Sequence, residues 1–278
     1  MVMITMEPFK LRNNECFFID EWARENSRLM VGFTSKNGGF SRDPFSNMNL
    51  GLHVSDSLID VRENRQKIAE LLDFPLHSWV CAEQTHEIHI EKVTKKDGGK
   101  GSILYDDSFK RTDGFFTKEK GILLALCYAD CVPLYFYHQD TGAIGIAHAG
   151  WKGTLGGIAS EMIRIFESEG VEKEEIHVVI GPAICKNCYI VDERIIFLVE
   201  KLLEEDENKP YNQIGANQYE LDLKQLNKAP LLKAGLNERN IQVTNLCTSC
   251  DNKYFFSHRK EKGKTGRMMG FIGWKEDL

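Results

Sequence analysis

The sequence predicts an α/β fold, because short apolar runs typical of strands alternate with amphipathic segments typical of helices. Residues 121–127 form an almost continuous apolar run, as expected for a strand that is covered on both faces. Residues 156–170 instead repeat apolar side chains at helical spacing. No internal repeat or low-complexity linker divides the chain, so we expect a single domain over residues 1–278.

The remaining elements follow from the same patterns. The other strands are expected at 16–19, 29–33, 50–54, 86–90, 113–117, 130–137, 143–149, 176–180 and 241–243. The other helices are expected at 57–72, 191–203 and 221–234. Residues 34–49 and 95–110 are rich in glycine and polar residues and predict long loops. The acidic, asparagine-rich stretch 205–219 predicts an exposed insertion.

Composition indicates an ordinary soluble protein. The 278 residues are 42% hydrophobic and 27% charged, with a mean hydropathy of −0.34. A net charge of −6 gives no general attraction to nucleic acid, and no apolar run reaches the length of a membrane span. Eight cysteines without an export signal favour reduced thiols and a cytoplasmic location.

The segment 130–154 holds the first candidate site. Two apolar runs flank a polar turn, which predicts a β-hairpin. Cys131 begins the first run and His148 ends the second, so antiparallel pairing should bring them together although they are 17 residues apart. Three glycines follow within eight residues, and they allow the backbone to approach a ligand closely. The charged Lys152 lies among them. Taken singly, a cysteine is more often a buried apolar residue and a histidine a surface residue.

His86 is a third candidate ligand, because alternation in 86–90 places it on one face and His89 on the other. Two imidazoles and a thiolate suit zinc or copper(I) better than magnesium or calcium. Three protein ligands leave one position open, as catalytic zinc requires, and zinc lowers the pKa of a bound water to roughly 7.

Two Cys-x-x-Cys pairs form a second pattern. Cys185 with Cys188 and Cys247 with Cys250 together match the ligand types of a four-thiolate zinc site. The 58 residues between the pairs exceed the roughly 15–20 usual in zinc ribbons. We therefore expect ordinary buried thiols, with structural zinc as the alternative.

Several motifs in order along the chain resemble those of one family. They are Gln-Thr-His at 84–86, Ala-Asp-Cys-Val-Pro at 129–133, Ala-His-Ala-Gly-Trp-Lys-Gly-Thr at 147–154, Gly-Pro-Ala-Ile at 181–184 and Phe-Ser-His-Arg at 256–259. The chain resembles the YlmD/YfiH laccase-domain family from about residue 30 to residue 270. This resemblance implies a layered α/β sandwich with mixed β-sheets flanked by helices. It also implies that His86, Cys131 and His148 bind a catalytic zinc.

Members of this family were first called polyphenol oxidases and are now described as purine nucleoside phosphorylases with adenosine deaminase activity. The resemblance therefore implies phosphorolysis of adenosine or inosine, with methylthioadenosine as a further substrate, and deamination of adenosine. The expected partners are a purine nucleoside and phosphate. We expect Asp130, Lys152 and Arg65 to be catalytic. We expect Lys36, Asn49 and Arg259 to bind substrate or phosphate.

Some features leave alternatives open. Asp130 is a candidate proton shuttle, or it orients a metal ligand. Lys36 stands where the family often has arginine. Lysine keeps the positive charge but lacks the two parallel N–H donors with which a guanidinium group binds phosphate. Glu87 stands where the family often has glycine and should face away from the metal.

Three other functions remain possible from the residues alone. The first is copper-dependent, laccase-like oxidation of phenols, for which eight histidines are few. The second is thiol hydrolysis with Cys131 as nucleophile and His148 as base. The third is a zinc-stabilised binding protein without catalysis.

Overall fold

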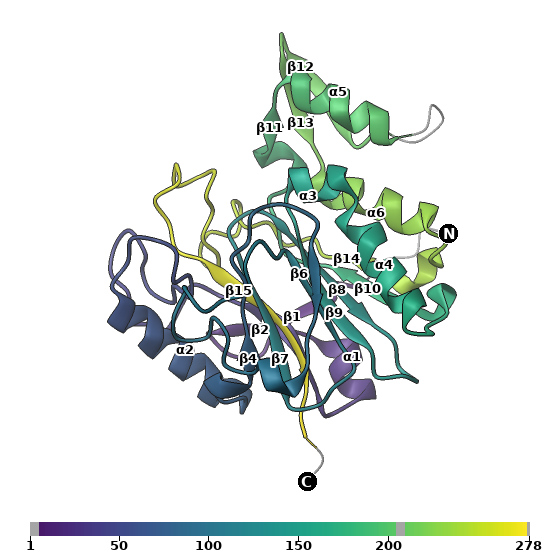
Figure 1. The fold of residues 1–278 in the computed structure, drawn as a ribbon. Coiled ribbons are helices and arrows are strands. Elements are labelled where there is room, and N and C mark those ends of the chain that lie inside the picture. The colour runs from purple at the N-terminus through teal and green to yellow at the C-terminus, as the bar shows by residue number, and fades with distance from the viewer. Residues whose placement is uncertain (1–5, 204–208, 277–278) are drawn as a thin grey trace.

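The protein is a layered sandwich in which two six-stranded sheets pack face to face (Figure 1). This computed structural model describes residues 6–203 and 209–276. The first sheet has the order β1 (Phe9–Leu11), β2 (Cys16–Ile19), β3 (Leu29–Thr34), β15 (Met268–Trp274), β7 (Ile122–Tyr128) and β4 (Trp79–Val80). The second has the order β14 (Ile241–Val243), β10 (His177–Ile180), β8 (Val132–Tyr137), β9 (Ile144–Ala149), β6 (Gly114–Thr117) and β5 (Ile90–Lys92).

Helices cover the outer face of each large sheet: α2 (Leu58–Leu72) packs on the first, and α3 (Trp151–Gly156), α4 (Ile158–Ser168) and α6 (Leu223–Lys233) pack on the second. The short helix α1 (Asp20–Glu25) follows β2, and its Trp22 belongs to the core between the sheets. Helix α5 (Glu193–Leu202) lies apart from both large sheets (Figure 1). A small sheet of β11 (Ile190–Val191), β13 (Gln218–Leu221) and β12 (Tyr211–Gly215) projects with α5 from one end (Figure 1). Both large sheets are mixed, with parallel pairs β4–β7, β10–β14 and β5–β6. The α/β class and the layered sandwich expected from the sequence are confirmed.

Alternation along each strand divides the core into layers. In β7, Leu124 and Leu126 point into the space between the two sheets, while Leu123 and Ala125 point toward α2. This arrangement explains the continuous apolar run at 121–127, since β7 is covered on both faces.

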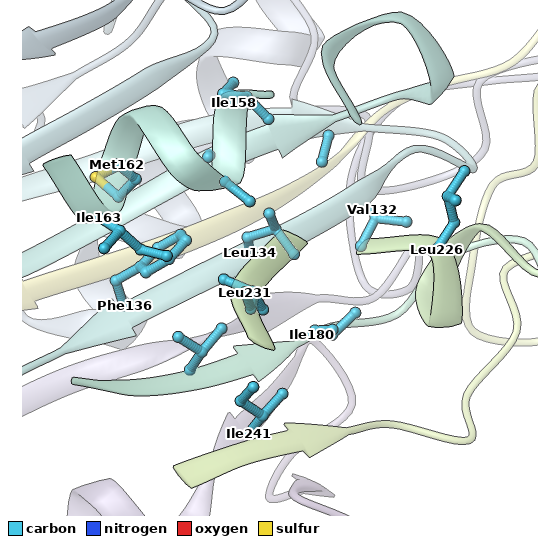
Figure 2. Packing of buried hydrophobic residues seen from close by; sticks show 14 of the residues in the cluster. Val132, Leu134, Phe136, Ile158, Met162, Ile163, Ile180, Leu226, Leu231 and Ile241 are labelled. Atoms are coloured by element: carbon cyan, nitrogen blue, oxygen red, sulfur yellow. The ribbon is translucent and has the colours of Figure 1, made fainter. Parts of the chain in front are cut away.

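The outer face of the second sheet packs against α4 and α6. Leu134 and Phe136 on β8 lie beneath Met162 and Ile163 of α4, and Leu231 of α6 joins the same cluster (Figure 2). All five side chains are at least 99% buried. At about 25 cal/mol per Å² of apolar surface, burial on this scale is the main force that holds the helices to the sheet.

The predicted hairpin is confirmed. Strands β8 and β9 pair antiparallel, and Pro133 lies opposite His148 at the end nearest the candidate site. The helix predicted at 156–170 is confirmed as α4, which begins at Ile158. The short helix α3 precedes it, and Gly157, with a left-handed φ of +90°, separates the two.

Four expectations are corrected. Residues 50–54 form turns, because Gly51 N–H bonds to the side chain of Asn49. The strand expected at 86–90 begins only at Ile90. The exposed insertion contains the hairpin β12–β13 within its described part, and residues 204–208 lie outside the described residues. Strand β15 was missed, although it pairs with β3 and β7 in the middle of its sheet.

Candidate active site

Three side chains from different elements converge beside the hairpin. Cys131 precedes β8, His148 lies on β9, and His86 comes from the loop before β5. Each offers one ligand atom, and these three atoms all lie within 4.8 Å of one another. His148 is buried, Cys131 is half-buried and His86 is exposed, so the group is reached from one side.

Backbone geometry makes room for this convergence. A Cβ atom on Gly150 would lie 3.0 Å from Cys131 Sγ and 3.1 Å from His86 Cδ2, so a side chain there would displace the sulfur or the ring. His86 itself has a φ of +63°, which is uncommon for a residue other than glycine. A conformation of this kind persists only where surrounding contacts fix it.

The buried carboxylate of Asp113 supplies those contacts. Oδ1 accepts hydrogen bonds from His86 N at 3.1 Å and from His148 Nδ1 at 2.7 Å. Oδ2 accepts from Glu87 N at 2.8 Å and from Thr85 N at 3.2 Å. One carboxylate therefore orients the ring of His148 and holds the loop that carries His86, which is the usual role of an outer partner of a metal ligand.

Sequence patterns did not single out Asp113. It precedes β6, and β6 pairs with β9, so Asp113 lies beside His148 only once the sheet has formed. The sequence feature that could have indicated Asp113 is a carboxylate at the start of an apolar strand. The residues of this strand do not reveal which other strand it pairs with.

The charges in the site support one another. Burial alone would raise the pKa of Cys131, but the imidazoles of His148 and His86 outweigh it and lower this pKa to about 6. Burial would lower the pKa of His148, but the thiolate of Cys131 and the carboxylate of Asp113 raise it to about 9. Burial also opposes ionisation of Asp113, yet His148 and the amides of Glu87 and His86 hold its pKa below the usual value. Asp113 is therefore ionised and accepts the Nδ1 proton, which leaves Nε2 of His148 as the donor atom for a metal.

The donor set lies in the wall of a cavity of about 420 Å³. This volume falls within the range of small-ligand pockets. The cavity is lined by His53, Gln84, His86, Tyr105, Cys127, Ala129, Asp130, Cys131, His148, Trp151, Ile184, Tyr189, His258, Arg259 and Arg267. Two arginines and several aromatic rings therefore face the same space as the donor set.

Besides the three predicted metal ligands, two further predicted residues, Asp130 and Arg259, line this cavity. Asp130 has a φ of +87° and is buried, and its carboxylate accepts from Thr248 Oγ1 at 2.6 Å and from Arg259 N at 2.7 Å. The guanidinium of Arg259 lies 4.9 Å from the centre of the Tyr189 ring and donates to Ile190 O at 2.7 Å. Asp130 thus faces the cavity and also holds the backbone of Arg259, whose side chain is the neighbouring cation.

The other predicted residues lie outside the cavity wall. Arg65, on α2, is buried and donates to the carbonyl oxygens of Leu50, Gly101 and Ser102. Asn49 is also buried, and its side chain bonds to Asp56 Oδ2 and to the backbone N–H groups of Gly51 and Arg267. Lys36 Nζ lies 5.9 Å from the Phe256 ring centre, and Lys152 Nζ lies 5.7 Å from that of Trp151.

Arg267 and His53 are cavity residues that were not among the predicted site residues. Arg267 follows the basic tail segment and precedes β15, so its position depended on the strand that was missed. His53 is open to the cavity, yet the protein around it and the charges of Arg267 and Arg65 lower its pKa to about 4. The charges of Arg267 and Arg65 therefore act on the part of the cavity where His53 lies.

No helix among the described residues combines the length and the apolar character needed to cross a membrane.

The fold and the site together define a class: a layered α/β sandwich with a His–Cys–His donor set in the wall of a cavity. The model of the family described as multi-copper polyphenol oxidoreductase laccase matches residues 30–275. The chain belongs to this laccase-domain family, as its motifs indicated.

Named relatives and solved structures agree with this membership. The chain is 46% identical over 278 residues to "Purine nucleoside phosphorylase YlmD" of Bacillus subtilis, covering 99% of this chain and 100% of the relative. It is 38% identical over 258 residues to "Purine nucleoside phosphorylase" of Staphylococcus epidermidis, covering 93% and 96%. The crystal structure of YlmD from Geobacillus stearothermophilus superposes with a TM-score of 0.94 at 43% identity, covering 97% and 100%. The crystal structure of the Bacillus licheniformis hypothetical protein YfiH gives 0.93 at 46% identity, covering 96% and 99%.

Proposed function

We propose that this protein is a zinc-dependent purine nucleoside phosphorylase that cleaves adenosine and inosine with phosphate. The observation that carries the proposal is the convergence of His86, Cys131 and His148 on one cavity that also contains two arginines. The names of the relatives give the reaction class.

The donor chemistry fits zinc. Nitrogen and sulfur donors favour zinc or copper(I), and the lowered pKa of Cys131 supplies the thiolate that either metal needs. When bound there, zinc would supply a Lewis acid with a position open to solvent or substrate. Asp113 would hold His148 in the tautomer that presents Nε2.

The remaining residues suit recognition of a nucleoside and an anion. Arg259 and Arg267 are the cations that face the cavity, and guanidinium groups bind phosphate in a bidentate manner. Tyr105, Trp151 and Tyr189 offer aromatic faces on which a purine could stack. Arg65 would contribute from behind the wall through its charge, since its N–H groups bond to carbonyls.

Lys36, Lys152 and Asn49 keep secondary roles in this proposal. Neither lysine has a hydrogen bond or ion pair that fixes its ammonium group among those described, so either could turn toward a bound anion. Asn49 positions the backbone of Arg267 through a 2.9 Å hydrogen bond. We assign Asp130 a proton-transfer role toward the base, because it is the carboxylate that lines the cavity.

Adenosine deamination is the second activity that we propose for the same site. It needs a carboxylate near the donor set and a route for water, and Asp130 meets the first requirement. Both Asp130 oxygens accept hydrogen bonds, one from Thr248 Oγ1 and one from Arg259 N, which hold the carboxylate in place at the cavity wall.

Two alternatives have less support. Multicopper oxidation of phenols needs a further histidine-rich copper cluster, and among the described residues the two metal-competent groups contain only two histidines. A thiol hydrolase needs Cys131 and one base, and would not require the second imidazole of His86 that this loop holds in place.

The test is a substrate panel on protein of defined metal content. Zinc-loaded protein should release hypoxanthine from inosine only with phosphate, and His86→Ala with His148→Ala should abolish this release. Phenol oxidation by the copper-loaded form without phosphorolysis by the zinc-loaded form would refute the proposal. If Lys36→Ala and Arg65→Ala leave the phosphate KM unchanged, their assignment to the phosphate site is wrong.

A further inference from the structure

A second group of potential ligands lies apart from the residues described so far. The sulfur atoms of Cys185, Cys188, Cys247 and Cys250 all lie within 4.8 Å of one another. The sequence led us to expect ordinary buried thiols, but only Cys247 is buried and Cys250 is exposed. The described part of the 58 residues between the two pairs contains α5, the small sheet and α6, and the chain then returns through β14 to the first pair.

The sulfur separations match a metal site and not a disulfide. Cys188 Sγ and Cys250 Sγ are 3.5 Å apart, and Cys185 Sγ and Cys250 Sγ are 3.8 Å apart. Tetrahedral zinc with Zn–S bonds of about 2.3 Å places sulfur atoms about 3.8 Å apart. A disulfide requires about 2.05 Å, so these two separations are close to the distance that a central ion would set and too long for a bond.

The backbone also supports a thiolate at Cys247. Cys247 Sγ accepts hydrogen bonds from Cys185 N at 3.2 Å and from Cys250 N at 3.3 Å. Amides that point at a sulfur stabilise its negative charge. Lys224, only 6% exposed, donates to Thr244 O and Leu246 O just before Cys247, which puts a buried cation beside the group.

We propose that Cys185, Cys188, Cys247 and Cys250 bind a structural zinc ion, separate from the candidate catalytic metal. Four thiolates form a closed tetrahedral set with no position left for substrate, which is the form of structural zinc sites. The proposal does not depend on the function proposed above.

The location gives this ion a role. The first pair lies in the segment that also carries Ile184 and Tyr189, which line the cavity. The second pair lies beside Thr248, which donates to Asp130, and shortly before Arg259. The zinc ion would join the two loops that form one side of the cavity. Among the described residues, the β-type pairing between these loops is one isolated bridge between Ala183 and Cys247.

Metal analysis of the full chain, purified under reducing conditions, tests the proposal. The native protein should contain about two zinc ions per chain, one for each donor set. C188S/C250S should lose one zinc ion, and C131S/H148A should lose the other. Cys16→Ala, which removes a buried thiol outside both groups, should leave the zinc content unchanged.

The three variants separate this inference from the proposed function. Zinc retained at the native level in C188S/C250S would overturn the four-thiolate site. Loss of zinc in C188S/C250S together with no loss in C131S/H148A would support this site and reject the catalytic one. In the C131S/H148A background, zinc removal should also speed tryptic cleavage after Lys186, which lies between Cys185 and Cys188, and after Lys253, which follows Cys250.

Crystals of the native protein keep the test decisive if C188S/C250S does not fold. Anomalous scattering measured on both sides of the zinc edge should give a peak between the four sulfur atoms. Iron at this position, or a bond between Cys188 and Cys250 with no metal peak, would overturn the proposal.

Discussion

Substitution of Asp113 by asparagine tests the organisation of the candidate catalytic site. The carboxylate accepts from His148 Nδ1 at 2.7 Å, from His86 N at 3.1 Å and from Glu87 N at 2.8 Å. Asparagine keeps one oxygen and turns the other into a donor, so whichever oxygen is lost, an N–H group faces another N–H group.

The magnitude follows from those contacts. Loss of an outer partner of a ligand typically costs 10–100-fold in metal affinity, equivalent to about 1.4–2.7 kcal/mol. Each buried donor left without an acceptor costs about 1–3 kcal/mol, so the folded state should lose stability as well. We expect Asp113→Asn to bind zinc 10–100-fold more weakly and to have a lower free energy of unfolding.

Competition with a chromophoric chelator measures zinc affinity for both proteins, with circular dichroism to establish folding. Asp192→Asn is the matched control, because Asp192 caps α5 through Ile195 N and lies outside both donor sets. The control should bind zinc as the native protein does. A folded Asp113→Asn protein whose zinc affinity stays within about twofold of the native value would refute the role given to this carboxylate.

Three further predictions concern charge, protons and the core. Arg267→Ala should raise the phosphate KM roughly 10–100-fold in steady-state phosphorolysis, because a charged hydrogen bond contributes about 1.5–3 kcal/mol; an unchanged KM would remove Arg267 from the anion site. In the metal-free protein Cys131 has a pKa of about 6 and His148 of about 9, so zinc binding between these values must displace about one proton from His148. Zinc affinity should therefore rise about tenfold per pH unit from about pH 7 to pH 9 and then level off. Calorimetry of zinc binding in buffers of different ionisation enthalpy measures the number of protons released, and a value of zero would refute this prediction. Leu124→Ala, between the sheets, should lower the free energy of unfolding in urea by about 2–5 kcal/mol, whereas exposed Leu104→Ala should change it by less than about 0.5 kcal/mol.

The sequence by itself determined the local parts of this protein. The hairpin of β8 and β9 follows from two apolar runs and a short polar turn, and it brings Cys131 next to His148 without help from the rest of the chain. Helix α2 and the doubly covered strand β7 could also be predicted from their own residues, because the spacing of apolar side chains indicates which faces of an element are buried. The order of the motifs then indicated the family and its sandwich.

Only the tertiary structure decided which distant residues meet at the two donor sets and at the cavity. Asp113 reaches His148 through the pairing of β6 with β9, and Arg267 reaches the cavity through β15, whose place between β3 and β7 no local pattern specifies. Arg65 lies on a helix that was predicted well, yet the fold buries its guanidinium against carbonyl groups. The four cysteines meet across 58 residues for the same reason, since contacts at long sequence separation depend on how whole elements pack.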